Sequence, residues 1–118
     1  MTQWQDLLQR ASALRQAGRV AEAIQAYQRL LDVRPDLPES WYNLGWLQRQ
    51  ARQFEAALTS YRQALHRGIS DPHEVHLNRA VILSDHLHRP DDAQAELQAA
   101  LALAPRYGAA LLNLGNLH

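Results

Sequence analysis

Cysteine and lysine are both absent from the 118-residue sequence. Without cysteine the chain has no means of forming a disulfide, a thiolate metal site or a cysteine nucleophile. Arginine supplies all 12 basic residues, and these balance 12 acidic residues, so the formal net charge is zero. A neutral chain lacks the basic surface typical of nucleic-acid-binding proteins and the charge excess typical of disordered tails.

Long hydrophobic runs are missing as well. No stretch approaches the roughly 18 apolar residues that a membrane-spanning helix needs. The opening residues MTQWQDLLQR lack the charged-then-apolar layout of a secretory signal. With 47% hydrophobic and 20% charged residues, the chain is expected to be a soluble, cytoplasmic protein with neither nucleic acid nor membrane as a partner. The length suits one small domain over residues 1–118.

An internal repeat runs through the sequence. Ala23 and Ala57 lie 34 positions apart. Asn43, Asn78 and Asn113 recur at intervals of 35, and the segment WYNLG at 41–45 returns as LLNLG at 111–115. Repetition at this spacing is the signature of stacked structural units.

The apolar residues within each unit follow the period of a helix and not the alternation of a strand. Gly18 falls where a left-handed residue would end the first helix. Asp36 with Glu39 indicates a capping box for the third helix, and Asp71 with Glu74 indicates another for the fifth. Short connections favour antiparallel neighbours. The sequence predicts seven helices, near residues 3–17, 20–33, 38–51, 54–67, 72–87, 91–104 and 107–117.

A Trp-x2-Leu-Gly segment followed by an Ala-x3-aromatic pair and a proline resembles the tetratricopeptide repeat. The resemblance covers essentially the whole chain and is best over residues 38–71, at Trp41, Leu44, Gly45, Ala57, Tyr61 and Ala64. It implies an all-α, right-handed α-solenoid of antiparallel helix pairs. The expected repeats are residues 4–37, 38–72 and 73–107, with a half repeat or capping helix at 107–118.

Two departures from the family pattern fall in the turns between paired helices. Arg52 and His88 replace the small residue that the family has there. The third unit also carries an extra residue between its helices. These departures affect helix ends and leave the fold prediction unchanged.

No arrangement of residues indicates catalysis, since nucleophile elbow, phosphate-binding loop and dinucleotide fingerprint are all missing. His73 and His76 would share a helix face and could supply two metal ligands. His86, however, would lie about 15 Å further along the axis. We expect the histidines to be surface and turn residues, and the protein to have no enzyme activity, metal or cofactor.

In a stacked array the first helix of each unit would line a concave groove that binds a peptide or partner protein. One column along this face holds an amide at every step: Gln9, Asn43, Asn78 and Asn113. Amides could hydrogen-bond the backbone of an extended peptide whatever its side chains. The column is similar to the asparagine ladder of O-linked N-acetylglucosamine transferases. The alternative is that each amide caps or packs locally.

Other polar and aromatic groups share this face. Arg15 and Arg49, 34 positions apart, could hold acidic groups of a ligand or could simply be solvated. Trp46, with Tyr42 on the same face, is the candidate aromatic anchor, unless it belongs to the core. The family's two-carboxylate clamp for chaperone C-termini is not expected, because only Asn43 matches its pattern and lysine is absent.

Two alternatives remain open for the function. The chain would be either the substrate-docking module of a larger bacterial enzyme, of the glycosyltransferase, sulfotransferase or methyltransferase type, or a purely structural self-assembly element. Residues 107–118 reproduce a repeat opening, so we expect a longer array. We also expect the last helix to bury its leucines against a second copy of the chain: Leu111, Leu112, Leu114 and Leu117.

Overall fold

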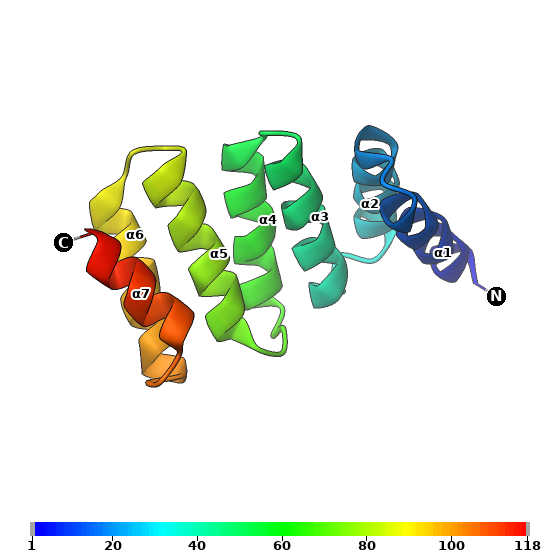
Figure 1. Cartoon of the computed structure of the whole chain (residues 1–118). Coiled ribbons are helices and arrows are strands. Elements are labelled where there is room, and N and C mark those ends of the chain that lie inside the picture. The colour runs from blue at the N-terminus through cyan, green and yellow to red at the C-terminus, as the bar shows by residue number, and fades with distance from the viewer. Residues whose placement is uncertain (1, 118) are drawn as a thin grey trace. The chain divides into compact units, whose positions relative to one another are not determined.

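The computed structural model describes residues 2–117, and within them it contains seven α-helices and no strand (Figure 1). Every predicted helix is present, with bounds that differ from the prediction by at most two residues. No helix among the described residues has the length and apolar character to cross a membrane. The helices are α1 Gln3–Gln16, α2 Val20–Val33, α3 Pro38–Gln50, α4 Phe54–His66, α5 Pro72–Asp85, α6 Pro90–Leu103 and α7 Gly108–Leu117.

The chain divides into two compact units, Met1–Gly68 and Ile69–His118. In the first unit α1 packs against α2, α2 against α3, and α3 against α4. In the second unit α5 packs against α6, and α7 contacts both. The paired helices of the repeats are therefore all formed. The single domain over residues 1–118 and its repeat boundaries stay predictions.

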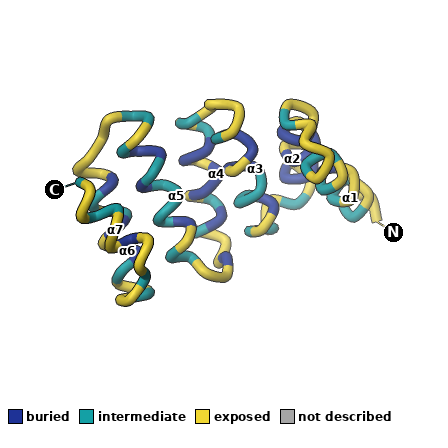
Figure 2. The backbone as a smooth tube through the Cα atoms, viewed as in Figure 1, coloured by how far each residue is buried: buried dark blue, intermediate teal, exposed yellow. Residues whose placement is uncertain are grey.

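Buried and exposed stretches alternate along the helices of the first unit (Figure 2). The buried residues combine very small with very large side chains. Ala23, Tyr27 and Leu30 of α2 are all fully buried. Gly45 of α3 faces the ring of Tyr61 so closely that an added Cβ would lie 2.9 Å from two ring carbons. Contacts this short leave no room for a side chain, so α3 and α4 approach closely only because residue 45 is glycine.

The turns inside the three helix pairs share a left-handed residue. Gly18 has φ +74°, as predicted, and the equivalent residues Arg52 and His88 have φ +62° and +53°. Glycine takes this conformation without steric cost, whereas arginine and histidine do not. The second and third turns therefore keep the backbone shape of the first despite their different side chains.

Backbone hydrogen bonds show how the third turn accommodates its extra residue. In the first two turns, the residue after the left-handed one donates its N–H to the carbonyl five positions earlier. In the third turn the same donor reaches back six positions. The helices keep their lengths, and the turn absorbs the insertion. The donor and acceptor pairs are Arg19 and Leu14, Gln53 and Gln48, and Arg89 and Leu83.

The two predicted capping boxes are wrong. The residue before α3 is Leu37, and no side chain caps that helix. Asp36 instead accepts two hydrogen bonds from Arg34, at 2.8 and 2.9 Å, and these bonds lower the pKa of Asp36 to about 2. Asp71 does precede α5, but its left-handed backbone, φ +55°, differs from the extended form that a cap requires, and its side chain makes no capping bond.

Candidate functional site

The predicted site residues all lie on the first helices of the repeats, but in two sets. Six belong to the first unit and two to the second. A single groove lined by all eight therefore stays a prediction. The residues are Gln9 and Arg15 on α1, Tyr42, Asn43, Trp46 and Arg49 on α3, Asn78 on α5 and Asn113 on α7.

Arg15 is held in place by a tyrosine of the paired helix. Its Nε donates a hydrogen bond of 3.1 Å to the hydroxyl of Tyr27. Tyr27 is fully buried, so it provides a fixed acceptor. The bond uses one of the donor groups of the guanidinium and leaves its two terminal nitrogens for other partners. Arg15 is thus a partly anchored cation on α1.

Arg49 and Tyr61 repeat this pairing 34 residues later, with different geometry. Tyr61 is fully buried, and its hydroxyl makes no hydrogen bond within the described part of the chain. Burial raises the pKa of Tyr61 above its usual value, the neighbouring Tyr42 adds to that rise, and the Arg49 guanidinium opposes it. Arg49 is therefore close enough to act on the charge of the hydroxyl, but no hydrogen bond joins the two groups within the described chain.

Tyr27 and Tyr61 are neighbours of the two candidate arginines, and the sequence analysis did not include them in the candidate site. The signal was present, because Arg15 precedes Tyr27 by 12 positions and Arg49 precedes Tyr61 by the same interval. Residues at equivalent places on paired helices recur together when the repeat is regular. A spacing that is repeated once in this way indicates a contact.

The three tryptophans differ in their surroundings. Trp46 is 40% exposed, and its ring is therefore open to a ligand. Trp41 donates a hydrogen bond of 2.8 Å from Nε1 to the carbonyl of Pro35. Trp4 lies under the guanidinium of Arg34, 4.2 Å from the ring centroid. Trp41 and Trp4 thus serve the fold, and Trp46 is the tryptophan on the candidate surface.

Tyr42 belongs to the same surface of α3 as Trp46 and packs against Tyr61 of α4. Its ring centroid lies 5.5 Å from that of Tyr61, with the two planes tilted by 50°. Tilted pairs at this distance are favourable. Tyr42 is only partly buried, so one part of its ring packs on α4 and the rest remains accessible beside Asn43.

The four amides of the column differ in their burial and in their interactions within the chain. Gln9 is exposed and Asn43 is half-buried. Asn113 donates a hydrogen bond of 2.8 Å from Nδ2 to the carbonyl of Ala109, one turn earlier in α7. Asn78 also has an interaction partner. The Asn113 side chain thus bonds its own helix, as the alternative interpretation of the column expects, although its oxygen can still accept a hydrogen bond from a ligand.

A buried polar pair stiffens the α3–α4 hairpin. The hydroxyl of Ser60 donates a hydrogen bond of 2.6 Å to Oε1 of Gln48, and the two residues are only 2% and 4% exposed. A buried polar pair of this kind fixes the register of the packed helices, because any slip would leave both groups unpaired. The equivalent positions in the first repeat are Leu14 and Ala26. The repeat pattern therefore did not predict a polar pair at these positions.

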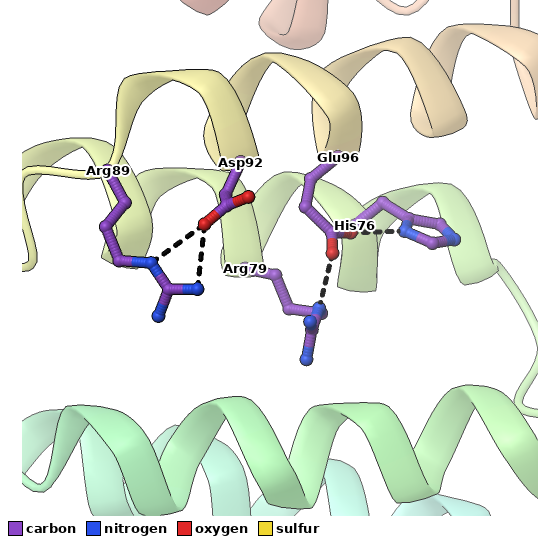
Figure 3. A network of polar contacts seen from close by, with 5 residues as sticks. All are labelled: His76, Arg79, Arg89, Asp92 and Glu96. Carbon is purple, nitrogen blue, oxygen red and sulfur yellow. Dashed lines mark hydrogen bonds and ion pairs between the residues drawn. The ribbon is translucent and has the colours of Figure 1, made fainter.

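The histidines of α5 serve the packing of that helix. His76 and Arg79 both contact Glu96 of α6, at 2.6 and 2.9 Å (Figure 3). The ring of His73 meets that of Tyr107 edge-on, with centroids 4.9 Å apart. Among the described residues, no three histidine, aspartate or glutamate side chains are grouped so that they could hold a metal ion.

The charge of Glu96 reflects this network. Burial raises the pKa of Glu96, but hydrogen bonds from His76 and Arg79, together with the positive charge of Arg79, outweigh burial and lower it below the usual value. Glu96 therefore remains ionised and links two side chains of α5 to α6. Figure 3 also shows a separate pair at the start of α6, in which Arg89 binds Asp92 at 2.7 Å.

The family model of the tetratricopeptide repeat matches residues 8–72, 42–83 and 87–118. No curated protein matches the sequence. The crystal structure of MamA is similar, with a TM-score of 0.87 and 16% identity over 98% of this chain and 66% of that one.

Two peptide complexes also have this fold. One is the Yersinia enterocolitica type III secretion chaperone SycD with a peptide of the translocator YopD, with a TM-score of 0.84 and 17% identity over 96% of this chain and 90% of that one. The other is the second TPR domain of human RPAP3 with an HSP70 peptide, with a TM-score of 0.81 and 17% identity over 94% and 91% of the two chains. The TM-scores show that these proteins share the fold of this chain, and at identities this low the likeness extends to the fold alone.

Proposed function

Because the chain belongs to the tetratricopeptide repeat family, we propose that it is a scaffold that binds a peptide or partner protein along the first helices of its repeats. The observation that carries the proposal is the exposed ring of Trp46 on α3, with Asn43 and Arg49 three positions away on either side. Residues at this spacing share one helix face. The peptides bound by SycD and by RPAP3 support the same role for this fold.

The proposed binding mode divides the work among three kinds of side chain. Trp46 would bury an apolar side chain of the ligand, as large aromatic residues do at the centres of interfaces. Asn43 and the other amides of the column would hydrogen-bond the peptide backbone. Arg15 and Arg49 would meet acidic groups through their terminal nitrogens. Because Tyr27 already holds Arg15, less side-chain freedom is lost when that arginine binds.

The proposal includes no catalytic step, metal or cofactor. The polar clusters of the described residues are used within the fold: Ser60 binds Gln48, and Glu96 binds two side chains of α5. A cytoplasmic location and a bacterial source are part of the same proposal and follow from the composition and the family resemblance. Proteins or peptides are the proposed partners, and nucleic acids and membranes are not.

The proposal is tested with a random peptide library displayed on phage and selected against the whole chain. Peptides enriched by the parent are synthesised, and their Kd values are measured by calorimetry. We expect Trp46→Ala to raise Kd by about tenfold or more. The matched control is Val33→Ala, which trims an exposed apolar side chain of α2 and should leave Kd unchanged. Equal enrichment by the parent and by Trp46→Ala would remove the proposal.

The amide column is tested with the same peptides. Asn43→Ala combined with Asn78→Ala should weaken binding of every enriched peptide to a similar extent, because the amides would contact backbone and not side chains. A loss confined to peptides with particular side chains would assign these asparagines to sequence recognition. Equal binding by the double variant and the parent would remove the column from the site.

A second copy of the chain is a further proposed partner. Leu111 and Leu112 of α7 are 50% and 67% exposed, and neither belongs to the amide column. Self-association through α7 would bring two scaffolds together.

A further inference from the structure

The last helix leaves open a face that its counterparts bury. One position of the repeat always holds a small residue, namely Ala11, Gly45, Ala80 and Gly115. The first three are buried in helix pairs, where α1 packs with α2, α3 with α4, and α5 with α6. Gly115 is exposed, and an added Cβ there would meet no atom within 4 Å. The small residue of each of these first helices thus lies where the paired helix packs, and no described residue packs at the corresponding place on α7.

The open face is a continuous stripe along α7. Gly108, Leu111, Leu112 and Gly115 stand at the spacing of one helix face. All four are exposed. A Cβ added at Gly108, as at Gly115, would meet nothing within 4 Å. Ala110, on the other side of the helix, is fully buried, so α7 presents this stripe outward while it packs inward against α5 and α6.

The order of residues in the stripe is the same in both directions. Glycine, leucine, leucine and glycine read identically from either end, at positions 108, 111, 112 and 115. A two-fold axis requires that both partners use the same surface. If one residue of the first copy contacts a second residue of the other copy, that second residue of the first copy also contacts the first residue of the other copy. We propose that α7 pairs antiparallel with α7 of a second copy, around an axis between Leu111 and Leu112.

In this arrangement Leu111 packs against Leu112 of the second copy, and Gly108 lies opposite Gly115 of the second copy. The glycines have no side chain to hold the backbones apart, so the leucines can be buried on both sides. The inference rests on the proposed self-association and does not depend on the peptide site.

Charge also favours a second copy as the occupant. Residues 108–117 include no charged side chain, and the whole chain has a formal net charge of zero. Two copies therefore meet without electrostatic repulsion. In the second copy, α2, α4 and α6 are already packed in their own helix pairs. α7 of that copy presents the same stripe, with the exposed side chains of Leu111 and Leu112 at its centre.

The first experiment is sedimentation equilibrium of the whole chain over a wide concentration range. We expect the mass to rise from 13.4 kDa toward twice that value, and Leu112→Glu to stay monomeric at all concentrations. The matched control is Val33→Glu, which adds the same charge at an exposed apolar residue of α2 and should associate like the parent. A parent that is monomeric throughout, or two variants that behave alike, would overturn the proposal.

A glycine variant distinguishes a specific helix–helix contact from non-specific hydrophobic association. Gly115→Leu adds apolar surface but fills the space that the second helix needs, so we expect dimerisation to weaken by about tenfold or more. Tighter association of this variant would show that hydrophobicity alone drives the contact, and the proposed geometry would be wrong. Circular dichroism checks that each variant is folded. Peptide binding by Gly115→Leu should equal that of the parent, which keeps the two proposals distinguishable.

The absence of cysteine allows a direct test of the axis. Leu111→Cys places one thiol beside the proposed two-fold axis, close to the same residue of the second copy. Mild oxidation should yield a covalent dimer from Leu111→Cys and little from Leu103→Cys, which carries an equally exposed thiol at the end of α6. Equal cross-linking of the two variants would contradict pairing through α7.

Discussion

A single hydroxyl distinguishes the two arginine–tyrosine pairs. Tyr27 accepts a hydrogen bond from Arg15, whereas the buried hydroxyl of Tyr61 makes none within the described chain. We expect Tyr27→Phe to lower the free energy of unfolding by about 1 kcal/mol and Tyr61→Phe to leave it unchanged or raise it. Urea denaturation of both variants measures the difference. A larger loss at Tyr61 than at Tyr27 would show that the second pair is hydrogen-bonded after all.

The left-handed turn residues give a second comparison. His88 has φ +53°, so His88→Gly should raise the free energy of unfolding by about 0.5 to 1 kcal/mol. Gly18→Ala, with φ +74°, should lower it by about 1 kcal/mol. Arg52→Gly should gain less than His88→Gly, because the Arg52 guanidinium lies 5.2 Å from the ring centroid of Phe54. Thermal and urea melts that rank the three variants otherwise would contradict this view of the turns.

Sequence reasoning at the residue scale succeeded where neighbours are close along the chain. Gly18 was placed correctly because a helix end has a local signature. Asp36 was misassigned because its carboxylate binds Arg34, a competing partner just outside the helix. The contact of His76 with Glu96 joins residues 20 positions apart. It depends on how a lengthened turn sets the register of α5 on α6, which no local pattern reports.

Between elements, Gly45 sets the distance from α3 to α4. Gly45→Ala places a Cβ against the Tyr61 ring and should lower the free energy of unfolding by about 1 to 3 kcal/mol. Gly115→Ala is the matched control, since the same methyl group on α7 meets nothing. Measured at low concentration, the control should be as stable as the parent or more so, by up to about 1 kcal/mol, because alanine favours helix. Equal losses in both variants would mean that helix packing around Gly45 is loose.

The link from α5 to α6 should respond to acid. The folded state lowers the pKa of Glu96 below its usual value of 4.5, so the contribution of the carboxylate to stability is complete above that pH. The contribution is lost as the pH falls through the lower, folded pKa. The urea midpoint of the parent should therefore fall more steeply below about pH 4.5 than that of Glu96→Gln. Parallel curves for the two proteins would show that the carboxylate contributes nothing through its charge.

Helix positions were predictable because proline and glycine mark the ends. Pro72 and Pro90 begin α5 and α6, where a missing N–H costs nothing. Gln48 and Ser60 were not predictable as a pair, because the first repeat places apolar residues at both positions. Periodicity thus locates elements well, but it conceals a contact that occurs in one repeat only.

For the molecule as a whole, the helices should differ in their resistance to opening. Six residues of α2 are buried, against one residue of α7, Ala110. Local opening requires least energy where few apolar contacts must be broken. α1 likewise has one buried residue, Ala11. In hydrogen-exchange mass spectrometry of a dilute sample, α1 and α7 should therefore exchange faster than α2. If α7 pairs with a second copy, its exchange should slow as the concentration rises, while that of α2 stays constant.

The fold as a whole followed from the sequence because each helix pair depends mainly on contacts with its neighbours along the chain. The candidate site followed less completely. Periodicity put Asn43, Trp46 and Arg49 on one helix face, but it did not show that Trp46 is open or that a tyrosine holds Arg15. Exposure and side-chain partners depend on the packing of the second helices, which the first-helix pattern does not contain.

The lengthened turn between α5 and α6 has a practical consequence. Residues 86–89 take up one more position than the corresponding turns, and both adjoining helices are nevertheless 14 residues long. The hairpin therefore tolerates added chain at its tip. A fluorescent or affinity tag grafted between Leu87 and His88 would report on the protein while both ends of the polypeptide stay unmodified.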